Sequence, residues 1–278
     1  MEQISNFGIE NLRFASPGGL LLVAGPCVVE SAGVCEEVAG RLVEITGKLG
    51  MPFIFKASYR KANRSRGDSF RGLGDDEALE VLASIRNRFK VPVLTDVHES
   101  HEVARVSEVA DILQIPAFLI RQTMLIEAAA ATGKPLNLKK AQFLAPASMR
   151  FAVDKALAMG NRRLMLTERG TQFGYGDLVV DFRSIPEMQS LGFPVLLDVT
   201  HSLQRPNQAE GVSGGQPALI ELMARAGVAA GVNGLFLETH PDPSRALSDG
   251  SNMLPLDLAE KLLERIAILH ETVTRLCS

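Results

Sequence analysis

The chain contains no tryptophan and two tyrosines among 278 residues, and its formal net charge is −3. Proteins that bind single-stranded nucleic acid without sequence preference place aromatic side chains along a basic groove, where successive bases stack on them. A domain that binds nucleic acid also carries a basic field over one face. Neither feature is found in this sequence, and we therefore exclude nucleic acid as a partner.

Long apolar runs and paired cysteines are also missing. No stretch reaches eighteen uninterrupted apolar residues, and the first six residues lack a basic segment followed by an apolar one. The three cysteines, at positions 27, 35 and 277, are odd in number and widely spaced. This pattern does not resemble a disulfide framework and is typical of a reducing compartment. We expect a cytoplasmic protein with no membrane partner.

What the sequence does contain is a regular rhythm of short apolar runs. Eight runs of strand length occur, at 20–24, 52–55, 91–94, 112–115, 135–138, 164–166, 194–197 and 234–237. They are continuous rather than alternating, as expected for parallel strands buried on both faces. Segments with helical spacing lie between most of them, at 34–49, 75–89, 100–110, 121–131, 147–159, 218–230 and 256–276.

This alternation predicts an α/β fold in which residues 1–278 form a single (β/α)8 TIM barrel. Residues 1–19 are expected to form a short N-terminal hairpin or arm, and the least regular interval is 170–193. No Gly-x-Gly-x-x-Gly follows the first run, which favours the barrel over a doubly wound nucleotide-binding sheet, the alternative fold.

One segment concentrates positive charge. Residues 56–71 hold six Lys or Arg and a single acid, Asp68, with Gly, Asn and Ser interleaved and no helical period. Such a loop can wrap a phosphorylated ligand. The alternative is a solvated basic surface loop.

Polar or reactive residues follow the predicted strands, except that Gln114 lies inside the fourth run, and a TIM barrel places its chemistry at the carboxyl ends of its strands. In strand order they are Cys27, Lys56, Asp96, Gln114, Lys139, Arg169, Asp198 with His201, and Glu238. With Lys61, the cations Lys56, Lys139 and Arg169 would converge on one mouth. That arrangement favours a small, highly anionic substrate.

The same rim suggests a metal site. Cys27, His201 and Glu238 end the first, seventh and eighth strands, which are neighbours in a closed barrel, and Asp249 follows in the next loop. A thiolate, an imidazole and two carboxylates would suit Fe²⁺, Zn²⁺, Mn²⁺ or Co²⁺. The alternative for Cys27 is simple packing. By spacing alone His98 and His240 remain competing ligands.

Several motifs together resemble the family of 3-deoxy-D-manno-octulosonate 8-phosphate synthases. They are Ala24-Gly25-Pro26-Cys27, Phe55-Lys56-Ala57-Ser58, Lys61-Ala62-Asn63-Arg64-Ser65, Thr95-Asp96-Val97-His98-Glu99, Gln114-Ile115-Pro116-Ala117-Phe118-Leu119, Arg121-Gln122-Thr123, Phe173-Gly174-Tyr175, Asp198-Val199-Thr200-His201 and His240-Pro241-Asp242-Pro243. The resemblance runs from about residue 20 to 260. Metal-independent members have Asn where this chain has Cys27, so it resembles the metal-requiring class.

The resemblance implies that phosphoenolpyruvate condenses with D-arabinose 5-phosphate, a step in lipopolysaccharide biosynthesis. Lys56, Lys61, Lys139 and Arg169 would hold phosphoenolpyruvate, Asn63, Arg64 and Ser65 would hold the sugar phosphate, and Asp96 and Gln114 would also contact substrate. Cys27, His201, Glu238 and Asp249 would bind the divalent metal ion, and Lys56, His201 and Asp249 are the catalytic candidates. An Arg at the position of Arg121 reaches the sugar phosphate from an adjacent subunit in the family, which implies a homo-oligomer, expected to be a tetramer.

Two other functions remain open at this point. The related seven-carbon 3-deoxy-D-arabino-heptulosonate 7-phosphate synthases and the sialate-type synthases share the phosphoenolpyruvate chemistry. The seven-carbon enzymes typically show Lys-Pro-Arg-Thr/Ser where this chain has Lys61-Ala62-Asn63-Arg64-Ser65. A non-enzymatic phosphate-binding barrel is the third possibility, and it leaves the polar residue at every strand end unexplained.

Overall fold

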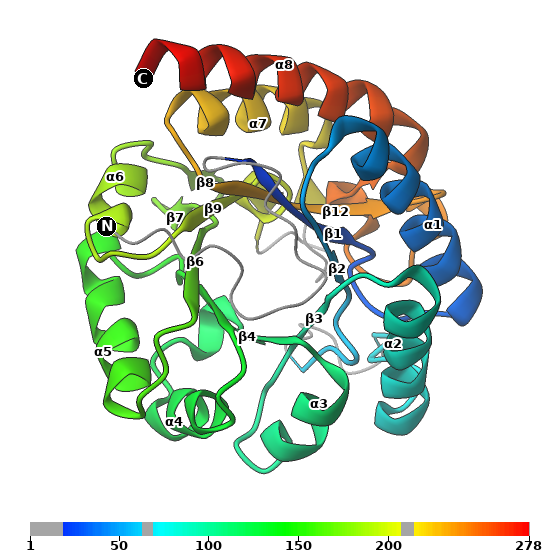
Figure 1. The fold of residues 1–278 in the computed structure, drawn as a ribbon, viewed down its shortest axis with the longest axis vertical. Helices are drawn as coiled ribbons and strands as arrows, with labels where there is room; N and C mark the ends of the chain where they lie inside the picture. Colours follow the sequence, from blue (N-terminus) through cyan, green and yellow to red (C-terminus); the bar gives the residue numbers. More distant parts are fainter. Residues whose placement is uncertain (1–18, 63–68, 207–213, 278) are drawn as a thin grey trace.

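The computed structural model describes residues 19–62, 69–206 and 214–277, and within them eight parallel strands close into a barrel (Figure 1). The strands are β1 (Leu21–Gly25), β2 (Phe53–Lys56), β3 (Val93–Asp96), β4 (Ile112–Ile115), β5 (Leu136–Lys139), β6 (Leu164–Glu168), β9 (Val195–Asp198) and β12 (Gly234–His240). Closure comes from the pairing of β1 with β12, which runs from Leu21 opposite Gly234 to Gly25 opposite Glu238. The predicted (β/α)8 barrel is confirmed.

Helices surround the barrel (Figure 1). They are α1 (Ala32–Leu49), α2 (Asp75–Phe89), α3 (Val103–Val109), α4 (Thr123–Ala131), α5 (Arg150–Ala158), α6 (Ser184–Gln189), α7 (Ile220–Ala229) and α8 (Ala259–Cys277). All the predicted helices are found, with α3 shorter than expected. The sequence did not predict α6, whose six residues are too few for a helical period to show. The arm expected at 1–19 falls, except for residue 19, outside the described residues.

The ends of α1 show how local sequence sets the helix boundaries. The Ser31 side chain accepts a hydrogen bond from the backbone N–H of Val34 at 3.2 Å, which caps the first turn. At the other end, Gly50 adopts a left-handed conformation with φ 60°, a conformation that glycine reaches without steric cost. The chain then turns directly into β2.

Alternation along the strands divides the core into two parts. Inside the barrel a cluster of buried residues from different strands fills the centre: Leu21, Val23, Ile54, Leu94, Ile112, Met165, Leu196 and Phe236. The neighbouring positions along each strand, such as Leu22, Phe55 and Leu197, face outward and join the larger core shared with the helices. Because each strand is buried on both faces, its sequence reads as one continuous apolar run.

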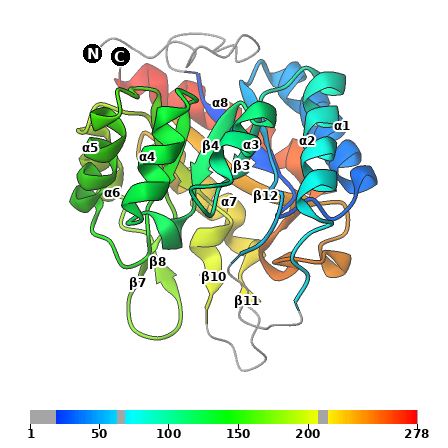
Figure 2. The ribbon, with the colours of Figure 1, turned by 90° about the horizontal axis from the view of Figure 1, so that it is seen from below.

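Two small hairpins extend from one side of the barrel. They are β7 (Thr171–Gln172) with β8 (Leu178–Val179) and β10 (Gln204–Arg205) with β11 (Gly214–Gly215), and Figure 2 shows them together below the strands. They follow β6 and β9, so this side is the carboxyl-terminal mouth of the barrel. Across the described residues, every helix is too short or too polar to cross a membrane.

Candidate active site

A cavity of about 150 Å³ opens at the carboxyl-terminal mouth of the barrel. Eight of the residues that the sequence assigned to the site line it: Lys56, Lys61, Asp96, Gln114, Lys139, Arg169, His201 and Asp249. His98 and Gln204 also line the cavity. The sequence considered His98 only as a competing metal ligand and gave Gln204 no role.

Strand periodicity explains why these side chains converge. Side chains two positions apart point to the same face of a strand. Lys56 therefore follows the interior residue Ile54, Asp96 follows Leu94, Gln114 follows Ile112, Asp198 follows Leu196 and Glu238 follows Phe236. A polar layer thus sits directly above the apolar centre of the barrel.

Lys56 is fully buried and is held by oxygens of its surroundings. Its Nζ donates to Glu238 Oε1 at 2.8 Å, to the backbone carbonyl of Cys27 at 3.2 Å and to Ser58 Oγ at 3.3 Å. Burial lowers the pKa of Lys56, but Glu238, Asp96 and Cys27 together more than offset this, so its pKa lies above the ordinary value. Lys56 is therefore an ammonium ion at neutral pH.

Asp96 is the acidic group on the opposite side of Ser58. Its Oδ2 accepts a hydrogen bond from Ser58 Oγ at 2.7 Å, and its Oδ1 accepts one from Gln114 Nε2. Burial raises the pKa of Asp96, but Lys56 and Lys61 outweigh it and hold the pKa well below its usual range. The pocket therefore presents an ionised carboxylate among its cations.

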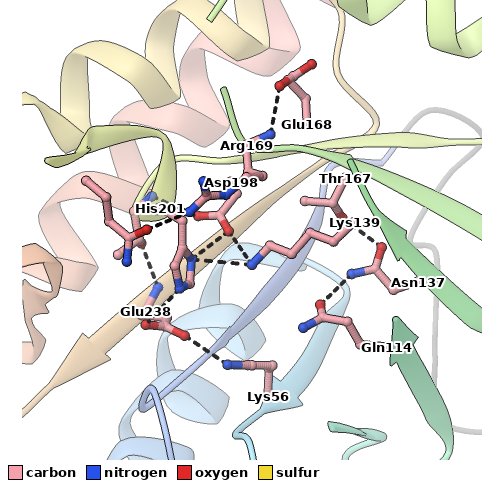
Figure 3. Close-up of polar contacts among 12 residues, drawn as sticks. Lys56, Gln114, Asn137, Lys139, Thr167, Glu168, Arg169, Asp198, His201 and Glu238 are labelled. Carbon is pink, nitrogen blue, oxygen red and sulfur yellow. Dashed lines mark hydrogen bonds and ion pairs between the residues drawn. The ribbon is translucent and has the colours of Figure 1, made fainter. Parts of the chain in front are cut away.

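Asp198 joins two of the predicted site residues, as Figure 3 shows. One oxygen, Oδ2, lies 2.7 Å from Nδ1 of His201 and 2.6 Å from Nζ of Lys139, while Oδ1 accepts the backbone N–H groups of Thr200 and His201. The pKa of the buried Asp198 is held far below its usual range, because His201 and Lys139 outweigh the effect of burial. Burial in turn lowers the pKa of Lys139, although Asp198 opposes the change. The sequence placed Asp198 at the rim but gave it no role.

The Arg169 guanidinium has an unused donor inside the pocket. Nη2 donates to Gln204 Oε1 at 2.6 Å, whereas the buried Nη1 has no hydrogen-bond partner among the described residues. The backbone N–H of Arg169 is fixed by Glu168 Oε1 at 2.9 Å (Figure 3). A buried unpaired donor is costly, and an anionic ligand would satisfy it.

Three of the four predicted metal ligands form one compact group. The ligand atoms of Cys27, Glu238 and Asp249 lie within 4.8 Å of one another. His201 lies beside the group, with Nε2 3.5 Å from Glu238 Oε2. The buried Glu238 Oε2 accepts no hydrogen bond from the described residues.

This donor set fits a divalent cation. Because Asp198 occupies Nδ1 of His201, the other ring nitrogen, Nε2, is turned toward Glu238, as in sites where a carboxylate orients a metal-binding histidine. Burial and the Glu238 carboxylate raise the pKa of the Cys27 thiol to about 12. A bound cation would stabilise the thiolate and give Glu238 Oε2 a partner.

The competing histidines are separated from this group. His240 Nε2 lies 2.8 Å from Glu30 Oε1, and its Nδ1 accepts the backbone N–H of Asp242 at 2.9 Å, so both ring nitrogens are engaged elsewhere. His98 lines the cavity on the side of Asp96 and does not belong to the Cys27 group.

Arg121 lies outside the central pocket. It is exposed and lines a separate hollow of about 280 Å³ with Leu144, Phe151 and Lys155. Among the described residues, the predicted substrate-binding residues that line the central cavity do not line this hollow. Asn63, Arg64 and Ser65 lie outside the described residues.

Comparison of the sequence with known proteins identifies the family of this chain. Residues 16–275 match the model of the DAHP synthetase I family. The chain is 54% identical over 256 residues, 92% of each chain, to the 2-dehydro-3-deoxyphosphooctonate aldolases of Xanthomonas axonopodis pv. citri and Xanthomonas campestris pv. campestris. It is 52% identical over 254 residues, 91% of each chain, to the protein of the same name from Nitrosococcus oceani. The chain belongs to the DAHP synthetase I family.

Proposed function

We propose that this protein is a 3-deoxy-D-manno-octulosonate 8-phosphate synthase, a transferase of lipopolysaccharide biosynthesis. It condenses phosphoenolpyruvate with D-arabinose 5-phosphate and water, and it releases phosphate. The observation that carries this proposal is the convergence of Lys56, Lys61, Lys139 and Arg169 on one small cavity, where the buried donor Nη1 of Arg169 has no partner among the described residues. The names of the relatives, at 52% and 54% identity, support the eight-carbon product.

In this reaction C3 of phosphoenolpyruvate forms a bond to the aldehyde carbon of the sugar. Water adds at C2, and phosphate leaves by cleavage of its C–O bond. Both substrates carry phosphate, so the site must neutralise a carboxylate and two phosphate groups. Fixed cations in a cavity shielded from water stabilise such charges strongly.

The residues divide this task between them. Lys56, Lys61, Lys139 and Arg169 hold the carboxylate and phosphate of phosphoenolpyruvate, with Arg169 donating from Nη1. Asp96 and Gln114, which line the same cavity, also contact substrate. We assign the sugar phosphate to Asn63, Arg64 and Ser65, and to Arg121 of an adjacent subunit in a homotetramer. The exposed position of Arg121 supports this assignment.

A divalent ion at Cys27, His201, Glu238 and Asp249 would supply Lewis-acid chemistry, either orienting the aldehyde or lowering the pKa of the attacking water. We assign proton handling near the reacting carbons to His201 and Asp249, which line the cavity. Lys56 acts there as a fixed ammonium, since its pKa lies above the ordinary value. We place the enzyme in the cytoplasm, a location supported by its three unpaired cysteines.

The test measures consumption of phosphoenolpyruvate with arabinose 5-phosphate, erythrose 4-phosphate or N-acetylmannosamine as the acceptor. We expect turnover with arabinose 5-phosphate, loss of turnover after chelation, and recovery on adding Mn²⁺, Fe²⁺ or Zn²⁺. Preference for erythrose 4-phosphate or N-acetylmannosamine would assign the chain to the seven-carbon or sialate-type chemistry. If no acceptor reacts, the remaining hypothesis is that the protein is a non-enzymatic phosphate-binding barrel.

Two cysteine variants separate the metal site from general effects of losing a thiol. Cys27→Ser should lose most of its activity and bind less metal, as measured by elemental analysis of the purified protein. Cys35→Ser is the matched control, because Cys35 is equally buried but lies in α1, away from the cavity. Full, metal-free activity of the Cys27→Ser variant would overturn the metal assignment.

A further inference from the structure

A chain of buried hydrogen bonds runs through four neighbouring strands, and Figure 3 shows its first two bonds, between Thr167, Asn137 and Gln114. Thr167 Oγ1 on β6 donates to Asn137 Oδ1 on β5 at 2.7 Å, and Asn137 Nδ2 donates to Gln114 Oε1 on β4 at 2.8 Å. Gln114 Nε2 then donates to Asp96 Oδ1 on β3. Thr167 and Asn137 have no exposed surface.

The chain has one direction. Asp96 is ionised and can only accept, so the Gln114 amide must place its nitrogen there and its oxygen toward Asn137. The Gln114 oxygen can only accept, so Asn137 must turn its nitrogen to Gln114, and the Asn137 oxygen then accepts from the Thr167 hydroxyl. Reversing any one amide would set oxygen against oxygen or nitrogen against nitrogen, and each such buried mismatch is costly.

This polarity decides what the cavity presents to a ligand. Gln114 and Asp96 line the cavity, whereas Asn137 and Thr167 are fully buried and do not line it. The Gln114 nitrogen, with a second N–H, therefore lies beside an ionised carboxylate, and both residues line the cavity. A donor next to an acceptor suits a hydroxyl, which both donates and accepts. The anionic oxygens of phosphoenolpyruvate would be repelled by Asp96.

We propose that Asn137 and Thr167 are positioning residues that hold the Gln114 amide with its nitrogen beside Asp96, so that Gln114 and Asp96 together recognise a hydroxyl group of the phosphorylated sugar. This inference rests on the proposed function for the identity of the sugar. It goes beyond that function by assigning sugar recognition to two residues that do not touch the substrate.

The experiment is steady-state kinetics of Thr167→Val with each substrate varied in turn. Valine keeps the shape of threonine but removes the hydroxyl, so Asn137 Oδ1 loses its donor and the Asn137 and Gln114 amides are held less firmly, although Asp96 still sets their direction. We expect the KM for arabinose 5-phosphate to rise about 3- to 10-fold, corresponding to one hydrogen bond, with the KM for phosphoenolpyruvate unchanged. Thr167→Ser keeps the hydroxyl and should behave as wild type.

A matched control removes a buried threonine hydroxyl elsewhere. Thr46 in α1 is buried, and its Oγ1 donates to the Leu42 carbonyl at 2.8 Å, away from the cavity. Thr46→Val should leave both KM values unchanged. If Thr167→Val also leaves them unchanged, if its effect falls on phosphoenolpyruvate, or if Thr167→Ser is impaired equally, the inference is wrong.

A more disruptive variant tests the direction of the chain itself. In Asn137→Asp the new carboxylate still accepts from Thr167 but faces the Gln114 oxygen, so we expect a larger rise in the same KM than for Thr167→Val. Circular dichroism checks that the Asn137→Asp variant folds. If it does not fold, the kinetics of Thr167→Val alone test whether these residues position Gln114. If the wild-type enzyme does not use arabinose 5-phosphate, the proposed function is wrong. If the wild type uses it and only the variants behave differently from expectation, the assignment of Asn137 and Thr167 is wrong.

Discussion

Replacing Lys140 by Met should destabilise the protein strongly, although Lys140 does not line the cavity. The side chain is fully buried, and Nζ lies 3.3 Å from Glu168 Oε1. It also donates to Thr171 Oγ1 and to the carbonyls of Ala141 and Gly170, at 3.1 to 3.3 Å. Burial lowers the pKa of Lys140, and Glu168 opposes that change. These contacts tie the loop after β5 to the loop after β6.

The magnitude follows from what the substitution leaves behind. Methionine fills a similar volume, but the Glu168 carboxylate remains buried without its cation. Removing one partner of a buried ion pair costs about 3–5 kcal/mol. Glu168 Oε1 keeps its bonds from the backbone N–H groups of Arg169 and Gly170, at 2.9 and 2.6 Å, which places the expected loss at the lower end of that range, about 3 kcal/mol.

The assay is urea unfolding followed by circular dichroism, with the free energy of unfolding compared at equal m values. Lys261→Met on the exposed side of α8 is the control for loss of a lysine charge, and it should change stability by less than about 0.5 kcal/mol. The double variant Lys140→Met with Glu168→Gln should recover part of the loss, because the uncompensated charge is gone. A Lys140→Met protein within about 1 kcal/mol of wild type would refute this reasoning.

Three further predictions concern the site and its support. Asp198→Asn should lower kcat/KM at saturating metal by about 10- to 100-fold with the fold retained, since His201 loses the carboxylate that orients it; wild-type kinetics would contradict this role. Gly25→Ala should lower the free energy of unfolding by about 1–3 kcal/mol, because an added Cβ would lie 2.1 Å from the backbone oxygen of Lys56. An unchanged free energy of unfolding in urea would show that β1 and β2 can move apart at this position. Burial raises the pKa of Tyr59 to about 12, so the difference in tyrosinate absorbance between wild type and Tyr59→Phe should develop near that pH. The stability that Tyr59 contributes is then present below about pH 10 and lost as the pH rises toward 12, and a midpoint near pH 10 in folded protein would contradict the burial effect.

Much of the barrel could be predicted because its signals are local. A strand buried on both faces must be apolar throughout, so each of the eight strands left a continuous run in the sequence. The residue that ends each run then faces the mouth, which is why Lys56, Asp96 and Glu238 were found at the cavity or beside it. The short helix α6 left no such signal, since six residues complete fewer than two helical turns.

The sequence could not assign roles that depend on which side chains meet. Asp198 stood at a strand end like its neighbours, and only the structure shows one of its oxygens between His201 and Lys139. Lys139, the last residue of β5, faces the cavity, whereas Lys140, the next residue, points away from it toward Glu168. Consecutive side chains along an extended chain point to opposite faces.

By itself the sequence determined the number and order of the β/α units, the polar rim and the candidate ligands, because these follow from hydrophobic periodicity and residue type along the chain. The tertiary structure decided the contacts that make the rim a site. Closure of β1 against β12 brings Cys27 within 3.5 Å of an Asp249 oxygen, 222 residues away. Pairing of β3 to β6 likewise brings Asp96, Gln114, Asn137 and Thr167 together in one chain of hydrogen bonds. Such contacts depend on distances and orientations across strands, which are fixed only when the barrel closes.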